Sequence, residues 1–234
     1  MTSSQGRLWV RWLAEFALIL VSVYLAVYLE GASQRRSERS AARVALTQLL
    51  GELQADIGDF DRIIAKQDSL HTDYSNLGRW LAHPASYPAD SVAGALYRIS
   101  SENSTLFPRR SSWTTMVAGG QLADLDAPEL VLQLGQIYET IYPRIDYNSR
   151  FYDEALGNAI QGSAAIRWQS LQSTPLSQDA ADVERLASSL EWVHGAWNVW
   201  YRDLLITNRR DVVDQVESLE SYLGDRDGPA TAPQ

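Results

Sequence analysis

Four carboxylates lie close together in the sequence and are the residues whose types and spacing best suit chemistry. They are Glu52, Asp56, Asp59 and Asp61. On a helix, residues 52, 56 and 59 share one side, so they could bind a divalent cation or supply a general acid. A solvated acidic face opposite the apolar face of the same helix is the simpler interpretation. We therefore predict neither a catalytic residue nor a metal site among them.

The other residue types that serve enzymes form no stronger pattern. The three histidines, His71, His83 and His194, have no i, i+4 spacing, and His194 lies on or near an apolar stripe. This favours a buried or interfacial histidine over a metal ligand. The chain has no cysteine, which excludes disulfides, cysteine-bound zinc and iron–sulfur clusters. It also has no Walker P-loop, G-x-S-x-G or H-E-x-x-H motif, so we expect a protein that is not an enzyme and has no cofactor.

Three tryptophans near the C-terminus could form a contact surface. Trp192, Trp197 and Trp200 follow one another at short intervals, and Tyr201 adjoins them. One interpretation is a core with a rim that faces a membrane. The other is a surface for contact with a protein or a pigment, since tryptophan and tyrosine are enriched at binding hot spots.

An apolar segment near the N-terminus predicts a membrane anchor. Residues 8–29 read LWVRWLAEFALILVSVYLAVYL, and 22 helical residues span about 33 Å, close to the hydrocarbon thickness of a bilayer. Aromatic residues lie near both ends, as is typical of the two membrane interfaces. These interface residues are Trp9, Trp12, Tyr24 and Tyr28. We predict a short tail over 1–7 and a transmembrane anchor over 8–30.

The anchor carries a carboxylate. Its uninterrupted apolar part, residues 16–29, is about 21 Å long and begins directly after Glu15. Arg11 is one turn away, so the two could form an ion pair in the interface; alternatively Glu15 contacts a partner helix. A cleaved signal peptide is the main rival, but cleavage after Ala32 would place Glu30 where a small neutral residue is required. The sequence therefore favours an uncleaved anchor.

Charge is divided unevenly along the chain. Residues 1–43 contain six arginines and three glutamates, which leaves the other residues with 14 basic and 26 acidic side chains and a net charge of −12. So acidic a domain repels phosphate backbones, which excludes nucleic acid as a partner. The arginines beside the anchor can meet anionic lipid, and their distribution slightly favours a cytoplasmic position for the domain.

Apolar residues at regular spacing predict a long helix after the anchor. Their steps of 4, 3, 4, 3 and 4 residues form a heptad seam, and no proline occurs before Pro84. The seam residues are Leu46, Leu50, Leu53, Ile57, Phe60 and Ile64. We expect one helix from the anchor to about Leu70. The seam either joins a bundle or dimerises, and three heptads favour the bundle.

Prolines, glycines and capping residues divide the rest of the chain. Breaks are expected at the two prolines 84 and 88, followed by a short helix over 91–99 and a loop over 100–108. Ser111 or Ser112 should cap a helix over 113–118 that ends at Gly119-Gly120. Asp126 should cap the next helix, with Pro128 in its first turn.

Two further helices complete the prediction. Pro143 should either kink the helix that precedes it or start a new one. The final segment opens near Pro175 and Ser177, with apolar residues at intervals of three and four from Val183 to Leu204, then a second stretch in shifted phase. The fold class is therefore all-α: a transmembrane helix that runs into an antiparallel helical bundle over 31–224, with a disordered polar tail over 225–234.

Two stretches resemble a known family. Residues 14–57, AEFALILVSVYLAVYLEGASQRRSERSAARVALTQLLGELQADI, and residues 111–156, SSWTTMVAGGQLADLDAPELVLQLGQIYETIYPRIDYNSRFYDEAL, resemble an uncharacterised bacterial family of single-pass membrane proteins that has only a domain-of-unknown-function label. The resemblance implies an inner-membrane location and a periplasmic domain. This differs from the cytoplasmic position that the distribution of arginines slightly favours. It implies no catalytic residue and no known activity.

Three hypotheses follow for the function. The leading one is a non-enzymatic accessory or scaffold subunit of a larger membrane complex, for example an energy-transducing or photosynthetic assembly. Its partners would be the lipid bilayer and other membrane subunits, or a second copy of itself. The alternative is a membrane-anchored sensory or ligand-binding domain, and the third is an enzyme that uses the carboxylates near Asp56.

Overall fold

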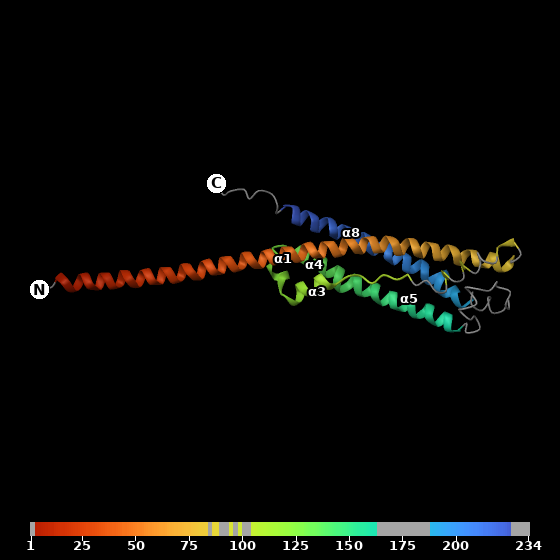
Figure 1. Ribbon diagram of the computed structural model, residues 1–234, viewed down its shortest axis with the longest axis horizontal. Coiled ribbons are helices and arrows are strands. Elements are labelled where there is room, and N and C mark those ends of the chain that lie inside the picture. Colours follow the sequence, from red (N-terminus) through yellow and green to blue (C-terminus); the bar gives the residue numbers. More distant parts are fainter. Residues whose placement is uncertain are drawn as a thin grey trace.

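A computed structural model describes residues 3–83, 86–88, 94–95, 98–99, 104–162 and 188–225. Within these ranges the secondary structure is helical, so the predicted all-α class is confirmed. The longest element, α1, covers Ser3–Ala82, and helix α8 covers Asn198–Asp225. Figure 1 shows α8 running back along α1 in the opposite direction, so this pair is antiparallel as predicted.

Helix α1 is longer than the predicted helix, which ended near Leu70. Its 80 residues span about 120 Å and contain no proline, so no backbone N–H is missing along it. The N-terminal half stands clear of the other helices in Figure 1, and burial begins at Ala42. The apolar stretch 16–29 is exposed throughout. By length and composition it could cross a membrane, a criterion that a signal sequence also meets.

Three shorter elements lie at the end of the bundle nearest the apolar stretch. The extended segment 104–110 runs back along the bundle to reach them (Figure 1). They are α3 over Ser111–Ala118, the 3-10 turn η2 over Gln121–Asp124, and α4 over Pro128–Gln136. These three elements therefore come after the segment in which the chain runs back along the bundle.

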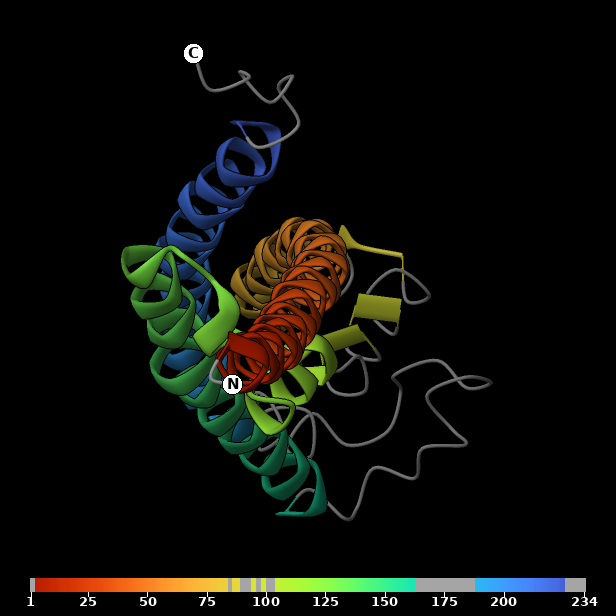
Figure 2. The ribbon, with the colours of Figure 1, turned by 90° about the vertical axis from the view of Figure 1, so that its left-hand side faces the viewer.

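Helix α4 continues without a break into the next long helix. The π-helical turn η3, Ile137–Ile141, joins it to α5, Tyr142–Gly162. Pro143 is the second residue of α5, directly after the π turn, so the irregularity expected at this proline is a π turn within one continuous helix. Pro143 cannot donate the usual hydrogen bond to the preceding turn, and the wider π turn accommodates that loss. Viewed along α1, the α4–α5 helix and α8 lie on the same side of it (Figure 2).

The heptad seam packs inside this bundle. Leu46, Leu53 and Phe60 are fully buried in the main core, and the other three seam residues are partly buried against it. The bundle alternative is therefore confirmed. Leu49 and Ile63, which the heptad spacing did not select, are buried as well. Each such leucine or phenylalanine contributes about 1.5–3 kcal/mol to folding.

The predicted stripe of the last helix is only partly confirmed, because Leu190, Val193 and Leu204 are buried but Trp200 is exposed. A second π turn, η4 over Glu191–Trp197, precedes α8. A π turn contains one residue more than an α-helical turn, so the side chains after it point in a different direction from those of a regular helix. The buried side therefore contains His194 and Asn198, whereas Trp192 and Trp200 are 48% and 40% exposed. Helix α8 then continues to Asp225, and Val212, Val216 and Leu219 of the predicted second stretch are buried.

Two predicted helix caps are wrong. The residue before α3 is Arg110, because Ser111 and Ser112 lie inside the helix, and the residue before α4 is Ala127 instead of Asp126. Neither position makes a side-chain cap. The predicted end of α3 is confirmed: Gly120 has a φ of 70°, a left-handed conformation that favours glycine.

Several predictions lie wholly or partly outside the described residues. For the predicted helix 91–99, positions 94, 95, 98 and 99 are helical. The start of the final segment near Pro175, Ser177 and Val183 lies outside, as do most of the tail 225–234 and the first two residues. The side chains of Trp9 and Arg11 are also outside.

Candidate functional site

Asp56 forms the most highly connected polar centre of the bundle. Its carboxylate is fully buried, although the sequence suggested a solvated acidic face. The Tyr142 hydroxyl donates to Oδ2 at 2.8 Å, and the Arg109 guanidinium donates to Oδ1 at 2.6 Å. The backbone N–H of Arg109 lies 3.3 and 3.2 Å from the two oxygens. Both carboxylate oxygens are thus engaged by donors from two distant segments.

Burial and hydrogen bonds act in opposite directions on this centre. Burial raises the pKa of Asp56, while the hydrogen bonds from Tyr142 and Arg109 lower it, and the net effect is a raised pKa. Burial also raises the pKa values of Tyr142 and of the neighbouring Tyr138. The phenols therefore stay protonated at neutral pH and act as donors or as packing groups, not as bases.

The four predicted carboxylates do not converge on one point. Glu52 accepts hydrogen bonds from the hydroxyl of Ser111 and the backbone N–H of Ser112. A residue of α1 therefore provides the acceptor for donors in the first turn of α3. Asp59 pairs with Arg62 and Arg109, and Asp61 pairs with Arg209. Over the described ranges, no group of three potential metal ligands comes together. Each carboxylate instead ties α1 to another segment or to its own next turn.

A second polar layer supports the irregular backbone between α1 and α3. Buried backbone groups outside regular structure need side-chain partners. Gln67 donates to the carbonyl of Ser104 at 2.5 Å, and Ser149 donates to the carbonyl of Leu106 at 2.7 Å. Like the bond from Arg109 to Asp56, these bonds fix the segment 104–110 against the helices. We interpret the buried polar residues as structural for this reason.

His194 belongs to the same layer. It is fully buried, and its Nε2 donates to the carbonyl of Ile99 at 2.5 Å. Its Nδ1 then accepts from the Tyr152 hydroxyl at 3.4 Å, and His71 donates to the carbonyl of His194 at 3.0 Å. Burial lowers the pKa of His194 to about 4. The histidine is therefore neutral at physiological pH and has a fixed tautomer.

An exposed aromatic cluster is the candidate site for contact with a partner. We call it the aromatic face. Its members are Tyr147, Phe151, Trp192, Trp197 and Trp200, which interact through a chain of neighbouring rings with centroids 4.6 to 6.5 Å apart. Tyr147 is 69% exposed and Phe151 is 38% exposed. Stacking restricts the rings, so they can bury area on binding at a small entropic cost.

The aromatic face lies far from the apolar stretch. Trp197 packs against the core cluster that contains Leu70 and Leu77 of α1. Leu70 is about 60 Å along the helix from Leu29, so the tryptophans do not lie beside the apolar stretch. Tyr147 and Phe151 were not predicted to join the tryptophans, although their i, i+4 spacing in α5 was the available signal.

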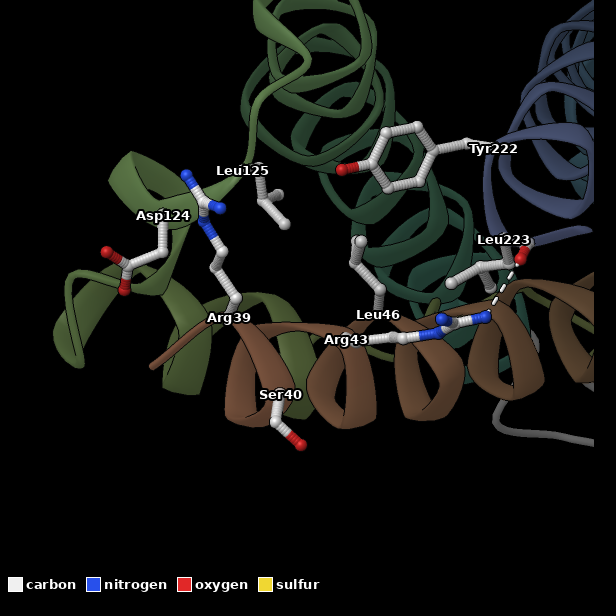
Figure 3. Close-up of a pocket in the computed structure, with 8 residues that line it drawn as sticks. All are labelled: Arg39, Ser40, Arg43, Leu46, Asp124, Leu125, Tyr222 and Leu223. Atoms are coloured by element: carbon white, nitrogen blue, oxygen red, sulfur yellow. Dashed lines mark hydrogen bonds between the residues drawn. The ribbon is translucent and has the colours of Figure 1, made fainter. Parts of the chain in front are cut away.

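Two hollows complete the set of candidate sites. The proximal pocket, about 290 Å³, lies at the end of the bundle nearest the apolar stretch (Figure 3). It is lined by Arg39, Ser40, Arg43, Leu46, Asp124, Leu125, Tyr222 and Leu223. The polar groove, about 430 Å³, separates α4, η3 and α5 from α8. Gln215 lines this groove and is 5% exposed, and its Nε2 has no hydrogen-bond partner among the described residues.

The predicted interface residues of the anchor lie along the exposed N-terminal part of α1. Trp12, Glu15, Tyr24 and Tyr28 are exposed on α1. Their spacing places two of them toward each end of the apolar stretch, as the anchor prediction requires. The described residues include no helix that packs against this part of α1.

Comparison with known protein families gives a match. The model described as "Family of unknown function (DUF6090)" matches residues 15–184, which is more than half of the chain. The match includes both stretches that resembled a family of unknown function, apart from Ala14. No curated protein and no solved structure matches the chain.

Proposed function

We propose that this chain, which belongs to the family of unknown function DUF6090, is a non-enzymatic accessory subunit of a larger complex in a bacterial inner membrane. The observation that carries the proposal is the continuity of α1. One helix contains the exposed apolar stretch and the buried seam of the bundle. A membrane anchor and the domain it holds would thus be parts of one rigid element.

The exposed apolar stretch supports the anchor. An apolar patch of this length on a soluble protein would be an association site, whereas in a bilayer it faces lipid. Trp12, Tyr24 and Tyr28 would lie toward the two interfaces, where amphipathic rings are favoured. Burial begins only at Ala42, after the arginines that follow the stretch.

The aromatic face supports a scaffold role. Rigid α1 would hold this face about 60 Å from the bilayer, at a fixed distance from the anchor. Its occupant in this proposal is another subunit of the complex that inserts an apolar side chain between the rings. Residues 44–234 carry a net charge of −12, so a basic rim on that subunit would be complementary.

The buried polar groups support a role without catalysis. The oxygens of Asp56 are occupied by the donors that hold segment 104–110, and His194 bonds to a backbone carbonyl. A catalytic base or nucleophile needs a free atom that a substrate can reach. Asp56 and His194 are instead used to satisfy the backbone groups of Arg109 and Ile99.

The aromatic face can be tested by substitution. We expect Trp192→Ala combined with Trp200→Ala to reduce the recovery of a stoichiometric partner from mild detergent by more than tenfold, because aromatic hot spots each contribute 2 kcal/mol or more. Leu132→Ala is the matched control, since Leu132 is an exposed apolar residue on α4, outside the face. Recovery is measured by quantitative affinity purification, and the circular dichroism spectrum of each variant verifies folding.

Two results would contradict the scaffold proposal. One is purification of the wild-type chain as a monomer with no partner in a fixed ratio. The other is equal partner recovery with the double variant and with Leu132→Ala.

The polar groove favours a second candidate function, a ligand-binding or sensory domain. The unpartnered amide of Gln215 offers a buried donor to a small ligand rich in hydroxyl or amide oxygens. We expect such a ligand to raise the Tm of the wild-type chain but not that of Gln215→Leu. Gln48→Leu, on the exposed side of α1, is the control. A thermal-shift screen of polyols, sugars and amides with no difference between wild type and Gln215→Leu argues against this function.

A further inference from the structure

The polar groove lies between two helical walls that present polar side chains to each other. One wall is α8, and the other is the continuous helix α4–η3–α5. Of the residues that line the groove, only Ile137 and Ile141 are apolar. Among the described residues, no hydrogen bond or ion pair joins one wall to the other across it. The groove thus keeps polar groups that the fold itself does not use.

Buried residues form the floor of the groove. They are Ile137, Ile141, Asn208 and Gln215, each at most 7% exposed. The Nδ2 of Asn208 donates to the carbonyl of Leu204 at 2.8 Å, so its Oδ1 is left as an acceptor. Gln215 supplies the complementary group, because its Nε2 has no acceptor in the described part of the chain. The two amides lie about two helical turns apart on α8.

Charged side chains of opposite sign line the same groove. Arg144 belongs to α5, whereas Asp211 and Asp214 belong to α8. None of these three side chains makes a hydrogen bond or an ion pair with another described residue. All three are at least partly exposed, so a ligand can reach them. The groove therefore offers a guanidinium from one wall and carboxylates from the other to a ligand that carries both charges.

The direction of the two walls sets the order of these groups. Figure 1 shows that α4 and α5 run in the direction opposite to α8, so Arg144 lies at the end of the groove where α8 enters it, toward Asn208. Asp211 is three residues further along α8, about 5 Å, and Gln215 is about one turn beyond Asp211. Along the groove, the order is therefore guanidinium, carboxylate and amide.

An α-amino acid with an amide in its side chain matches this order. Its carboxylate and ammonium group are joined through a single carbon, and charge-assisted hydrogen bonds of about 2.8 Å at each end can link Arg144 to Asp211. A guanidinium suits a carboxylate because it presents two parallel N–H donors. The side chain then continues toward Gln215. The volume of about 430 Å³ lies within the range of small-molecule sites, about 300–1,000 Å³.

We propose that the polar groove binds a free α-amino acid with a side-chain amide, with its carboxylate on Arg144, its ammonium group on Asp211 and its amide on Gln215. The inference rests on the ligand-binding candidate of the proposed function and names the class of ligand for that groove. A bound amino acid would connect α8 to the α4–α5 helix, which no described polar contact does across the groove. A peptide terminus shares part of this chemistry, but it carries only one of the two charges.

The test is isothermal titration calorimetry of the full chain in detergent at neutral pH, with L-glutamine as the probe. We expect one L-glutamine to bind per chain. N-acetyl-L-glutamine lacks the ammonium group and L-glutamine amide lacks the carboxylate, so each should bind at least tenfold more weakly, because it loses a charge-assisted hydrogen bond. L-norleucine keeps both charges but has no amide and should bind severalfold more weakly.

Substitutions identify the side chains that bind the two charges. Arg144→Gln and Asp211→Asn should each weaken L-glutamine binding at least tenfold. Asp211→Asn should also reduce the preference for L-glutamine over N-acetyl-L-glutamine, a change that a loss of folding does not produce. Arg150→Gln on α5 and Glu217→Gln on α8 make the same charge changes at exposed positions outside the groove, so they should leave binding unchanged. Circular dichroism verifies the fold of each variant.

Three results overturn the proposal. One is the absence of L-glutamine binding to the wild-type chain at millimolar concentration. Another is equal affinity of the wild-type chain for L-glutamine and for N-acetyl-L-glutamine, which would show that the ammonium group makes no contact. The third is equal weakening by the groove variants and by their charge-matched controls.

Failure of this inference is distinguishable from failure of the proposed function. A polyol, sugar or simple amide that raises the Tm of the wild-type chain but not that of Gln215→Leu supports the ligand-binding candidate. If L-glutamine does not bind to the same chain, the amino-acid ligand alone is overturned. A chain that none of these probes stabilises overturns both. Partner recovery tests the accessory-subunit proposal without reference to the groove.

Discussion

Asp56→Ala is expected to lower the free energy of unfolding by about 3 kcal/mol, more than any substitution of the neighbouring carboxylates. The buried hydroxyl of Tyr142 and the backbone N–H of Arg109 would both lose their acceptor. A buried donor without a partner costs about 1–3 kcal/mol. The Arg109 guanidinium is partly exposed and can be hydrated, which limits the total loss.

The control for this prediction is Asp61→Ala. Asp61 pairs with Arg209, but both side chains are substantially exposed, so the loss should stay below about 1 kcal/mol. Urea unfolding of the full chain in detergent, followed by tryptophan fluorescence, measures both variants. Equal destabilisation by the two substitutions would show that the buried hydrogen bonds of Asp56 do not contribute as argued.

Acidification is expected to destabilise the bundle through His194. Burial lowers the pKa of this histidine from 6.5 to about 4, so between these pH values the unfolded chain binds a proton that the folded chain does not. The stability associated with neutral His194 is complete above pH 6.5 and is lost as the pH falls toward 4. The loss amounts to about 3 kcal/mol over that interval.

A comparison of variants isolates the histidine. His194→Gln keeps a donor near the Ile99 carbonyl but cannot be protonated, so its stability should change less between pH 7 and pH 4.5 than that of wild type. The raised pKa of Asp56 acts in the opposite direction, but it does so in both proteins and cancels in the difference. His83→Gln, at an exposed position, should follow wild type. Parallel pH profiles for wild type and His194→Gln would contradict the prediction.

The sequence by itself determined the class of the fold and the position of its longest element. The lack of proline before Pro84 and the heptad steps from Leu46 to Ile64 predict one long helix with a single buried face. Gly119-Gly120 and Pro128 marked the ends of helices correctly. These signals are local, because they depend on backbone hydrogen bonds and on side chains three or four residues apart.

Only the tertiary structure decided what the polar residues contact. Asp56 meets Arg109 and Tyr142, which lie 53 and 86 residues away in the sequence. Periodicity reports which face of a helix is apolar, but it does not report which distant backbone group a buried carboxylate must satisfy. For this reason the interpretation of Asp56 as part of a solvated face was wrong, while the helix on which it lies was predicted.

The last helix shows the same limit. Its apolar spacing predicts a regular helix with Trp200 on the apolar stripe, but the π turn at Glu191–Trp197 rotates the face, so Asn198 is buried and Trp200 is exposed. The proximal pocket likewise exists only where α1, η2 and α8 meet. The sequence thus determined the helices and the apolar stretch, whereas packing between distant segments decided which side chains are left for a ligand or a partner.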